Sequence, residues 1–173
     1  AVFQGADYAR GLLMLTYEQD ASTRIERMSL TGERFDPIEL PGLGSAGIST
    51  DPDSTRAFVS YTSYNEPRTI YECDVVAGTL GAIWARPETP VDPESVIVRR
   101  IHATSKDGTK VPMFVVHRKD LDTSRPHPTL LYGYGGFNIS LTPRFISTNF
   151  PFYDAGGIYV VANLRGGGEF GES

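Results

Sequence analysis

Short strand signals recur at regular intervals between Ala1 and about Glu88, with turn residues and no helical period between them, and this spacing constrains the fold most. The segments are 12–17, 23–28, one that begins at Ile38, 57–62 and 69–73. Within 23–28, Ile25 faces away from its charged neighbours, and a loop over 65–67 separates the last two segments. Such strands are typical of antiparallel propeller blades, although a closed ring usually needs about 4–8 of them. The chain has no strict repeat, which neither supports nor excludes a propeller.

The pattern of predicted secondary structure changes after a proline- and acid-rich linker at 89–94. Residues 96–104 and 110–117 are expected to be strands, joined by a hairpin turn in which Asp107 and Gly108 form a strong turn signal. Pro112 lies inside the second strand and lacks a backbone donor, so it predicts an edge position or a bulge.

The last part of the chain reads as strand, helix, strand. We expect a strand over 129–132 and a helix from Pro143 to about Phe152, with Thr142 as its N-cap. Two glycines then precede a continuous apolar strand over 158–163, which is typical of a parallel sheet covered on both faces. The predicted fold is mixed: the last blades of a β-propeller over 1–88, then the first part of an α/β-hydrolase domain over 89–173.

Composition narrows the functional classes. A net charge of −5 argues against a nucleic-acid binder, which would usually carry a basic face. The single Cys73 has no internal disulfide partner, which fits a reducing compartment. Neither a secretory leader nor an apolar run of about 18 residues is visible, so we expect a soluble cytoplasmic protein with no membrane partner.

A glycine-rich stretch after residues 129–132 carries the main functional signal. Gly133, Gly135 and Gly136 interleave with two large aromatics, Tyr134 and Phe137. Glycines let a backbone approach a ligand closely, and a neutral phenol can donate a hydrogen bond to a developing oxyanion. Phe137 offers a flat face suited to a proline ring. The alternatives are structural: Tyr134 fills core volume at a strand end, and Phe137 packs in the core.

Other motifs are weaker. Ser173 has a preceding glycine, but the chain stops before a G-x-S-x-G elbow could be completed. Residues 166–171 match G-x-G-x-x-G, yet a dinucleotide site would need a following helix and an acidic residue about 20 positions later. Arg165 is better explained as the anchor of a tight loop beside the active site. The histidines are expected to be solvated or at strand edges, without metal-ligand spacing; they are His102, His117 and His127.

Three stretches together resemble the prolyl oligopeptidase family in its order and spacing, namely 105–114, 131–140 and 162–171. Residues 1–88 resemble the last part of the family's propeller more weakly. The resemblance implies that Tyr134 stabilises the oxyanion and that Phe137 lines the proline pocket. The loop after Gly135 follows the proline-specific pattern and differs from the oligopeptidase B branch, which cleaves after basic residues.

The resemblance further implies an internal fragment of a serine endopeptidase that cleaves short peptides after proline. The family's catalytic serine, acid and histidine would all lie beyond Ser173, so this chain alone is expected to be inactive. The family needs no metal or cofactor, and a full-length member is expected to be a monomer that binds no nucleic acid. A non-catalytic β-rich binding module remains the alternative.

Overall fold

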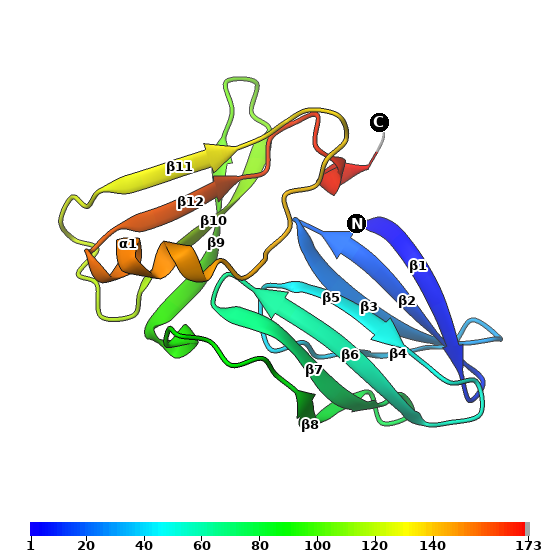
Figure 1. The fold of residues 1–173 in the computed structure, drawn as a ribbon. Coiled ribbons are helices and arrows are strands. Elements are labelled where there is room, and N and C mark those ends of the chain that lie inside the picture. Colours follow the sequence, from blue (N-terminus) through cyan, green and yellow to red (C-terminus); the bar gives the residue numbers. More distant parts are fainter. Residues whose placement is uncertain (172–173) are drawn as a thin grey trace.

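The computed structural model describes residues 1–171, which form three four-stranded sheets (Figure 1). The first sheet runs in chain order and contains β1 (Val2–Ala9), β2 (Leu12–Gln19), β3 (Ser22–Ser29) and β4 (Arg34–Ile38). The second also runs in chain order and contains β5 (Ser45–Ser49), β6 (Arg56–Ser63), β7 (Glu66–Asp74) and β8 (Thr79–Ala85). Every neighbouring pair in both sheets is antiparallel, as in two consecutive propeller blades.

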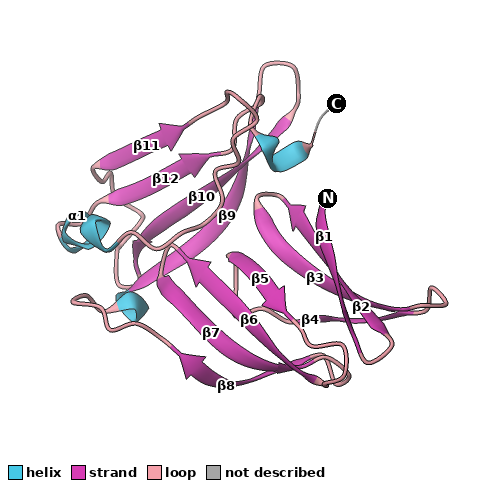
Figure 2. Ribbon diagram, turned by 45° about the vertical axis from the view of Figure 1, so that its right-hand side comes forward, coloured by secondary structure: helices cyan, strands magenta, loops and turns pink. Residues whose placement is uncertain are grey.

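The two blades lie next to each other (Figure 2). Apolar residues of their strands form a core that both blades share. Ile25 is buried and Arg24 is exposed, as the alternation predicts. The shared core combines residues from both sheets: Ala9, Met14, Ile25, Ile38, Ala57, Val59, Cys73 and Val75. The blades therefore stabilise one another by burying one continuous apolar layer.

The sequence prediction lacks β1, β5 and β8, and two further strand boundaries in the blades differ from it by three residues or more. The strand expected to begin at Ile38 ends there, because β4 pairs Ile38 with Ile25 and buries both side chains. The loop expected over 65–67 is shorter, since Glu66 and Pro67 already belong to β7. Cross-strand pairing decided both boundaries over local turn signals.

The third sheet contains β9 (Val96–Thr104), β10 (Lys110–Arg118), β11 (Thr129–Gly133) and β12 (Ile158–Ala162), in the order β11-β12-β10-β9. The predicted hairpin between β9 and β10 is confirmed, and Gly108 adopts a φ of 85° in its turn. β11 is parallel to β12, as predicted. The strand expected to be covered on both faces, β12, is buried from Tyr159 to Ala162, whereas all residues of its parallel partner β11 are exposed.

Pro112 does not lie on an edge strand or in a bulge. β10 lies between β9 and β12, and its pairing with β9 is regular through Pro112. The Pro112 carbonyl accepts a hydrogen bond from the Asn163 N–H at 3.0 Å, just past the end of β12. Because a residue's N and C=O point to the same side of a strand, the missing donor falls where the β12 ladder has already ended.

The predicted helix from Pro143 with Thr142 as N-cap is also wrong. The segment before Ser147 is irregular, a 3-10 turn η2 (Ser147–Asn149) follows, and the only α-helix in the described chain is α1 (Phe150–Asp154). Long-range bonds hold the irregular segment, including one from the Ser45 hydroxyl to the Pro143 carbonyl at 2.7 Å. The two glycines before β12 follow the end of α1, and Gly156 has a φ of 82°.

A second core joins the third sheet to the blades. The β2–β3 and β6–β7 turns insert Ala21 and Tyr64 among the aromatic side chains on β10 and β12. The Tyr64 ring lies 5.5 Å from that of Phe114 and 6.2 Å from that of Tyr159, centroid to centroid. Arg100 on β9 also donates to the Asp20 carbonyl at 3.2 Å. The junction is thus a packed core and not a loose linker.

Candidate functional site

Two glycine-containing loops contact each other at the carboxyl ends of β11 and β12, because these parallel strands end side by side (Figure 1). A side chain at Gly135 would collide with the carbonyl oxygen of Arg165, and one at Gly166 would collide with that of Gly135. The Asn138 N–H donates to the Gly166 carbonyl at 3.2 Å. Glycine is required at both positions for the loops to come this close.

Tyr134 and Phe137 project from the first of these loops in different ways. Tyr134 is half-buried, and its hydroxyl would lie 3.3 Å from a Cβ placed on Gly136, so the ring folds back over its own loop. Phe137 has a φ of 55° and is 91% exposed. Core packing is therefore excluded for Phe137 in the described chain. The left-handed turn at Phe137 and Asn138 presents an apolar ring to the outside, where a ligand could reach it.

Arg165 ties the second loop to the β9–β10 hairpin. Its guanidinium pairs with the Asp107 carboxylate and reaches the Ser105 hydroxyl at 3.3 Å. The hydrogen bond from Arg165 holds the pKa of Asp107 well below its usual range. The predicted anchoring role of Arg165 is thus confirmed in the geometry, and its partners could not be identified from sequence.

Glu169 is buried at the centre of this region, and no sequence pattern points to it. It belongs to the 3-10 turn η3 (Gly168–Phe170), and one carboxylate oxygen accepts the Leu141 N–H at 2.8 Å and the Asn163 side-chain N–H at 2.9 Å. A short turn thus follows the glycines where a dinucleotide site needs a helix. The other carboxylate oxygen lies against Gly167, where a phosphate would be repelled. Both features argue against nucleotide binding.

The histidines do not form a site. His117 is 4% exposed and its Nδ1 lies 2.7 Å from the Arg118 carbonyl, so the expectation of a solvated or edge position is wrong for it. β10 is a central strand, with β12 paired to Met113–Val116 on the side opposite β9. His102 is exposed, and His127 contacts the Asp122 carbonyl through Nε2 at 2.8 Å. Ser173 lies outside the described residues.

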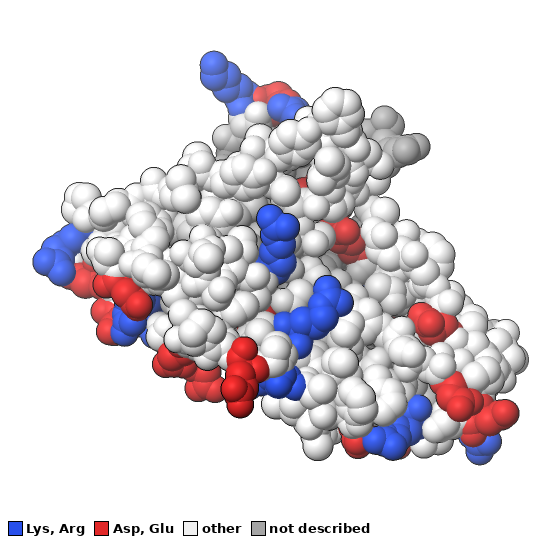
Figure 3. Space-filling model, in the orientation of Figure 1, with Lys and Arg blue, Asp and Glu red and all other residues white. Residues whose placement is uncertain are grey.

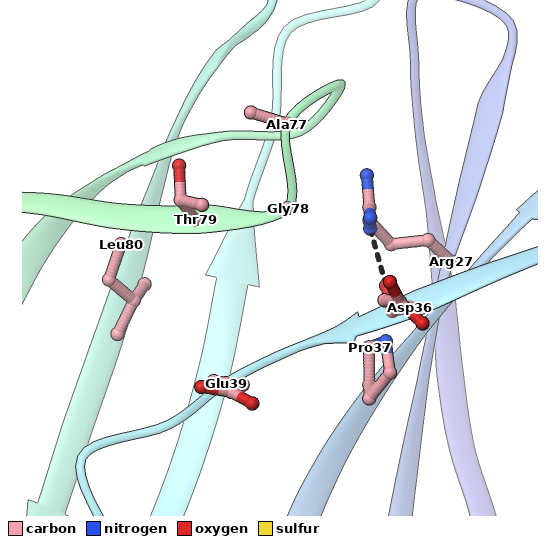
Figure 4. A pocket seen from close by; sticks show the side chains of 8 residues that line it. All are labelled: Arg27, Asp36, Pro37, Glu39, Ala77, Gly78, Thr79 and Leu80. Carbon is pink, nitrogen blue, oxygen red and sulfur yellow. Dashed lines mark hydrogen bonds between the residues drawn. The ribbon is translucent and has the colours of Figure 1, made fainter.

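A cavity of about 510 Å³ lies between the two blades (Figure 4). Arg27 extends into its wall from β3 and donates to the Asp36 carbonyl at 2.7 Å and to the Val76 carbonyl at 2.6 Å. The second acceptor belongs to the neighbouring blade, so Arg27 joins the blades. Asp36 and Glu39 are also among the lining residues. Nothing in this lining resembles an active site.

A smaller cavity of about 300 Å³ lies between the hairpin and the second glycine loop, with Lys110, Asn163 and Phe170 among its lining residues.

The surface over β11 and β12 carries few charges in Figure 3, consistent with the exposure of Leu131. Within residues 1–171, no group of three or more His, Cys, Asp or Glu is arranged to hold a metal ion. No helix of this part of the chain is long and apolar enough to cross a membrane.

Comparison with known proteins agrees with this architecture. Residues 1–85 match the family model for the N-terminal β-propeller domain of prolyl oligopeptidase. The prolyl endopeptidase of Elizabethkingia miricola is 38% identical over 163 residues, which are 94% of this chain and 23% of that protein. A solved structure from work on inter-domain dynamics in two prolyl endopeptidases superposes with a TM-score of 0.84 and 44% identity, covering 98% of this chain and 25% of the other.

Oligopeptidase B from Trypanosoma brucei shares the fold with a TM-score of 0.80 and is 27% identical. The match covers 98% of this chain and 26% of that chain. The fold and the matches define the class, proteins with an N-terminal β-propeller domain of the prolyl oligopeptidase type. The chain belongs to the prolyl oligopeptidase family. It spans about a quarter of the length of the relatives that it matches.

Proposed function

We propose that this chain supplies the oxyanion tyrosine and part of the proline pocket of a serine endopeptidase that cleaves peptides on the carboxyl side of proline. One observation carries the proposal: Tyr134 and Phe137 project from a loop whose backbone is fixed by close glycine contacts with the loop after β12. A loop that only reversed the chain would need neither the aromatic residues nor this support.

The arrangement of the third sheet supports the beginning of an α/β-hydrolase domain over 89–173. An antiparallel hairpin, β9–β10, leads into the parallel pair β11–β12, with α1 in the connection between the parallel strands. In open α/β sheets, ligands bind outside the carboxyl ends of the strands. Tyr134 follows directly after the carboxyl end of β11, which is the position that such a site requires.

The chemistry assigned to Tyr134 is electrostatic. When a serine attacks a scissile carbonyl, the oxygen gains negative charge, and a fixed donor lowers the barrier by meeting it there. The phenol is neutral at pH 7 and donates one hydrogen bond. Phe137 offers its ring to the proline side chain by apolar contact. The serine, its histidine base and the acid would come from outside this chain, which is therefore inactive alone.

The absence of activity is tested with the purified chain and a chromogenic Gly-Pro substrate. We expect no hydrolysis above the buffer rate, because within residues 1–171 no histidine is hydrogen-bonded to a serine or cysteine. A longer protein that contains this chain serves as the positive control. Turnover by the chain that a serine-directed inhibitor abolishes would refute this part of the proposal.

The role of Tyr134 is tested by Tyr134→Phe in that longer protein. In other enzymes, loss of one oxyanion donor lowers kcat by roughly 10²–10³. Here a backbone N–H beside the catalytic serine would remain as the second donor, so we expect a loss of about tenfold or more. Substrate binding should change little, since the bond forms mainly in the transition state. Wild-type kcat in this variant would show that the glycine-rich loop is only structural.

Phe137→Ala provides the matched contrast on the same loop. Removal of the ring takes away contact with the proline in the ground state as well as in the transition state, so KM should rise while kcat stays near the wild-type value. Steady-state kinetics with proline and alanine at the cleaved position separate the two effects. Equal KM values in the variant and the wild type would remove Phe137 from the pocket.

A further inference from the structure

Two buried carboxylates lie on elements that contact each other where the first blade touches the third sheet. Glu18 comes from β2, and Glu169 comes from η3, which packs against that strand. Glu18 is 8% exposed and Glu169 is 1% exposed. Two carboxylates this deeply buried need partners, because an unpaired buried charge is costly.

Each carboxylate has one oxygen with a partner and one without. Glu18 Oε2 accepts a long bond of 3.5 Å from the Gln4 side chain, whereas its Oε1 is buried with no partner. Glu169 Oε1 receives the N–H groups of Leu141 and Asn163, whereas its Oε2 is buried with no partner. Among the described residues, neither carboxylate takes part in an ion pair.

The groups facing this pair make two negative charges unfavourable. Burial raises the pKa of Glu18, the charge of Glu169 raises it further, and the nearby Ser140 hydroxyl acts in the opposite direction. On the other side, burial raises the pKa of Tyr64, the phenols of Tyr159 and Tyr153 raise it further, Arg144 lowers it, and the charge of Glu169 adds the smallest increase. The remaining contacts are the neutral donors of Gln4, Leu141 and Asn163.

We propose that Glu18 and Glu169 share one proton across the junction, so that a carboxyl group on one donates to the carboxylate of the other. The pair then carries a single negative charge, and the two oxygens without partners satisfy each other. Glu169 also holds Leu141, which follows the Tyr134 loop, so the protonation state of the pair affects how firmly that loop is attached to the first blade. The proton sharing does not rest on the proposed function.

The pH dependence has a definite sign. Since the pKa of Glu18 is raised in the folded chain above its ordinary value of 4.5, the stabilisation is fully present below that value. It is lost as the pH rises through the raised pKa. While one extra proton is bound in the folded state, the unfolding equilibrium constant should rise by up to about tenfold per pH unit.

The test compares urea unfolding of the wild-type chain with that of Glu18→Gln and Glu33→Gln between pH 4 and pH 9. Glu33 lies in an exposed turn, so its variant removes the same charge without touching the pair. We expect Glu18→Gln to unfold with a smaller equilibrium constant than wild type at pH 7, because its amide donates where the proton would. Its pH slope should be reduced, whereas Glu33→Gln should keep the wild-type slope.

Infrared spectra of the wild-type chain give a measurement that does not depend on the variants folding. A protonated carboxyl band should persist at pH 7, well above the ordinary pKa of glutamate. Absence of this band would overturn the proposal, as would equal pH slopes in wild type and Glu18→Gln. Stabilisation of the wild type, but not of Glu18→Gln, by Na⁺, Mg²⁺ or Ca²⁺ at pH 7 would also overturn it, because a cation would then replace the proton.

Discussion

The two blades and the third sheet solve the same problem of strand pairing in different ways. In the blades each strand pairs with its neighbour in sequence, and all partners are antiparallel. In the third sheet β12 lies between β10 and β11, and the edge strand β11 is exposed along its whole length. Local pairing gives complete blades, whereas the third sheet depends on contacts from elsewhere.

The junction shows where those contacts come from. Two blade turns complete the core of the third sheet by inserting Ala21 and Tyr64. β11 contributes no residue to this core, and all of its residues are exposed. The third sheet should therefore be sensitive to changes near the junction and tolerant of changes on β11. Four substitutions test this contrast, in order of decreasing effect.

Phe114→Ala should have the largest effect. Phe114 is fully buried in the core that blades and third sheet share, and truncation of a buried phenylalanine costs about 3–5 kcal/mol. Urea unfolding followed by circular dichroism measures the loss, and Phe137→Ala, at an exposed position, should leave stability within about 0.5 kcal/mol of wild type. Similar losses in the two variants would contradict the shared core.

Arg27→Met should destabilise the contact between the blades. The substitution keeps most of the apolar stem but removes the donors to the carbonyls of Asp36, Val75 and Val76. Hydrogen bonds that involve a charged group contribute about 1.5–3 kcal/mol, so a loss of that order is expected. Arg24→Met, on the exposed face of the same strand, is the control. Equal stabilities would mean that the apolar layer alone holds the blades together.

Gly135→Ala should disturb the site more than it disturbs the fold. The new methyl group would collide with the Arg165 carbonyl and separate the two loops, at a cost of about 1–3 kcal/mol. Gly5→Ala is the matched control, because nothing lies within 4 Å of a Cβ there. Hydrogen exchange at the Asn138 amide should accelerate in the first variant only. Unchanged exchange would show that the loops do not support each other.

Leu131→Lys should barely change the stability of the monomer. Leu131 is 65% exposed on β11, so the loss should stay within about 0.5 kcal/mol. The wild-type chain should associate through this exposed apolar strand, and a lysine on an edge strand opposes such pairing. Sedimentation velocity should therefore show more monomer for the variant. Equal fractions of monomer in the wild type and the variant would show that the chain associates through a surface other than β11.

Much of this architecture was predictable where the signal is local. Alternation placed Ile25 in the core, Asp107 and Gly108 marked the hairpin, and the apolar run at 158–163 indicated a parallel partner. The failures share a cause. Pro112 and His117 lie on a strand that is central because β12, distant in sequence, pairs with it. The Ser45 hydroxyl holds the segment that follows Thr142.

The site could be located but not assembled from sequence. The glycines and aromatics of the Tyr134 loop were visible because they are contiguous, although their catalytic roles remain proposals. Glu169 was not visible, because its importance lies in burial and in bonds to Leu141 and Asn163. A lone acid within a glycine run has no pattern that distinguishes it from a solvated turn residue.

The insertion of Ala21 and Tyr64 into the core of the third sheet has a consequence for how the chain folds. Their partners on β10 and β12 are far along the sequence, so this core has a high contact order and should form slowly. During synthesis the blades emerge first and can pair locally, but Tyr64 stays exposed until Tyr159 has left the ribosome. The junction between the blades and the third sheet is therefore the last part of this chain to fold. Until it forms, the exposed Tyr64 surface is open to association with other chains.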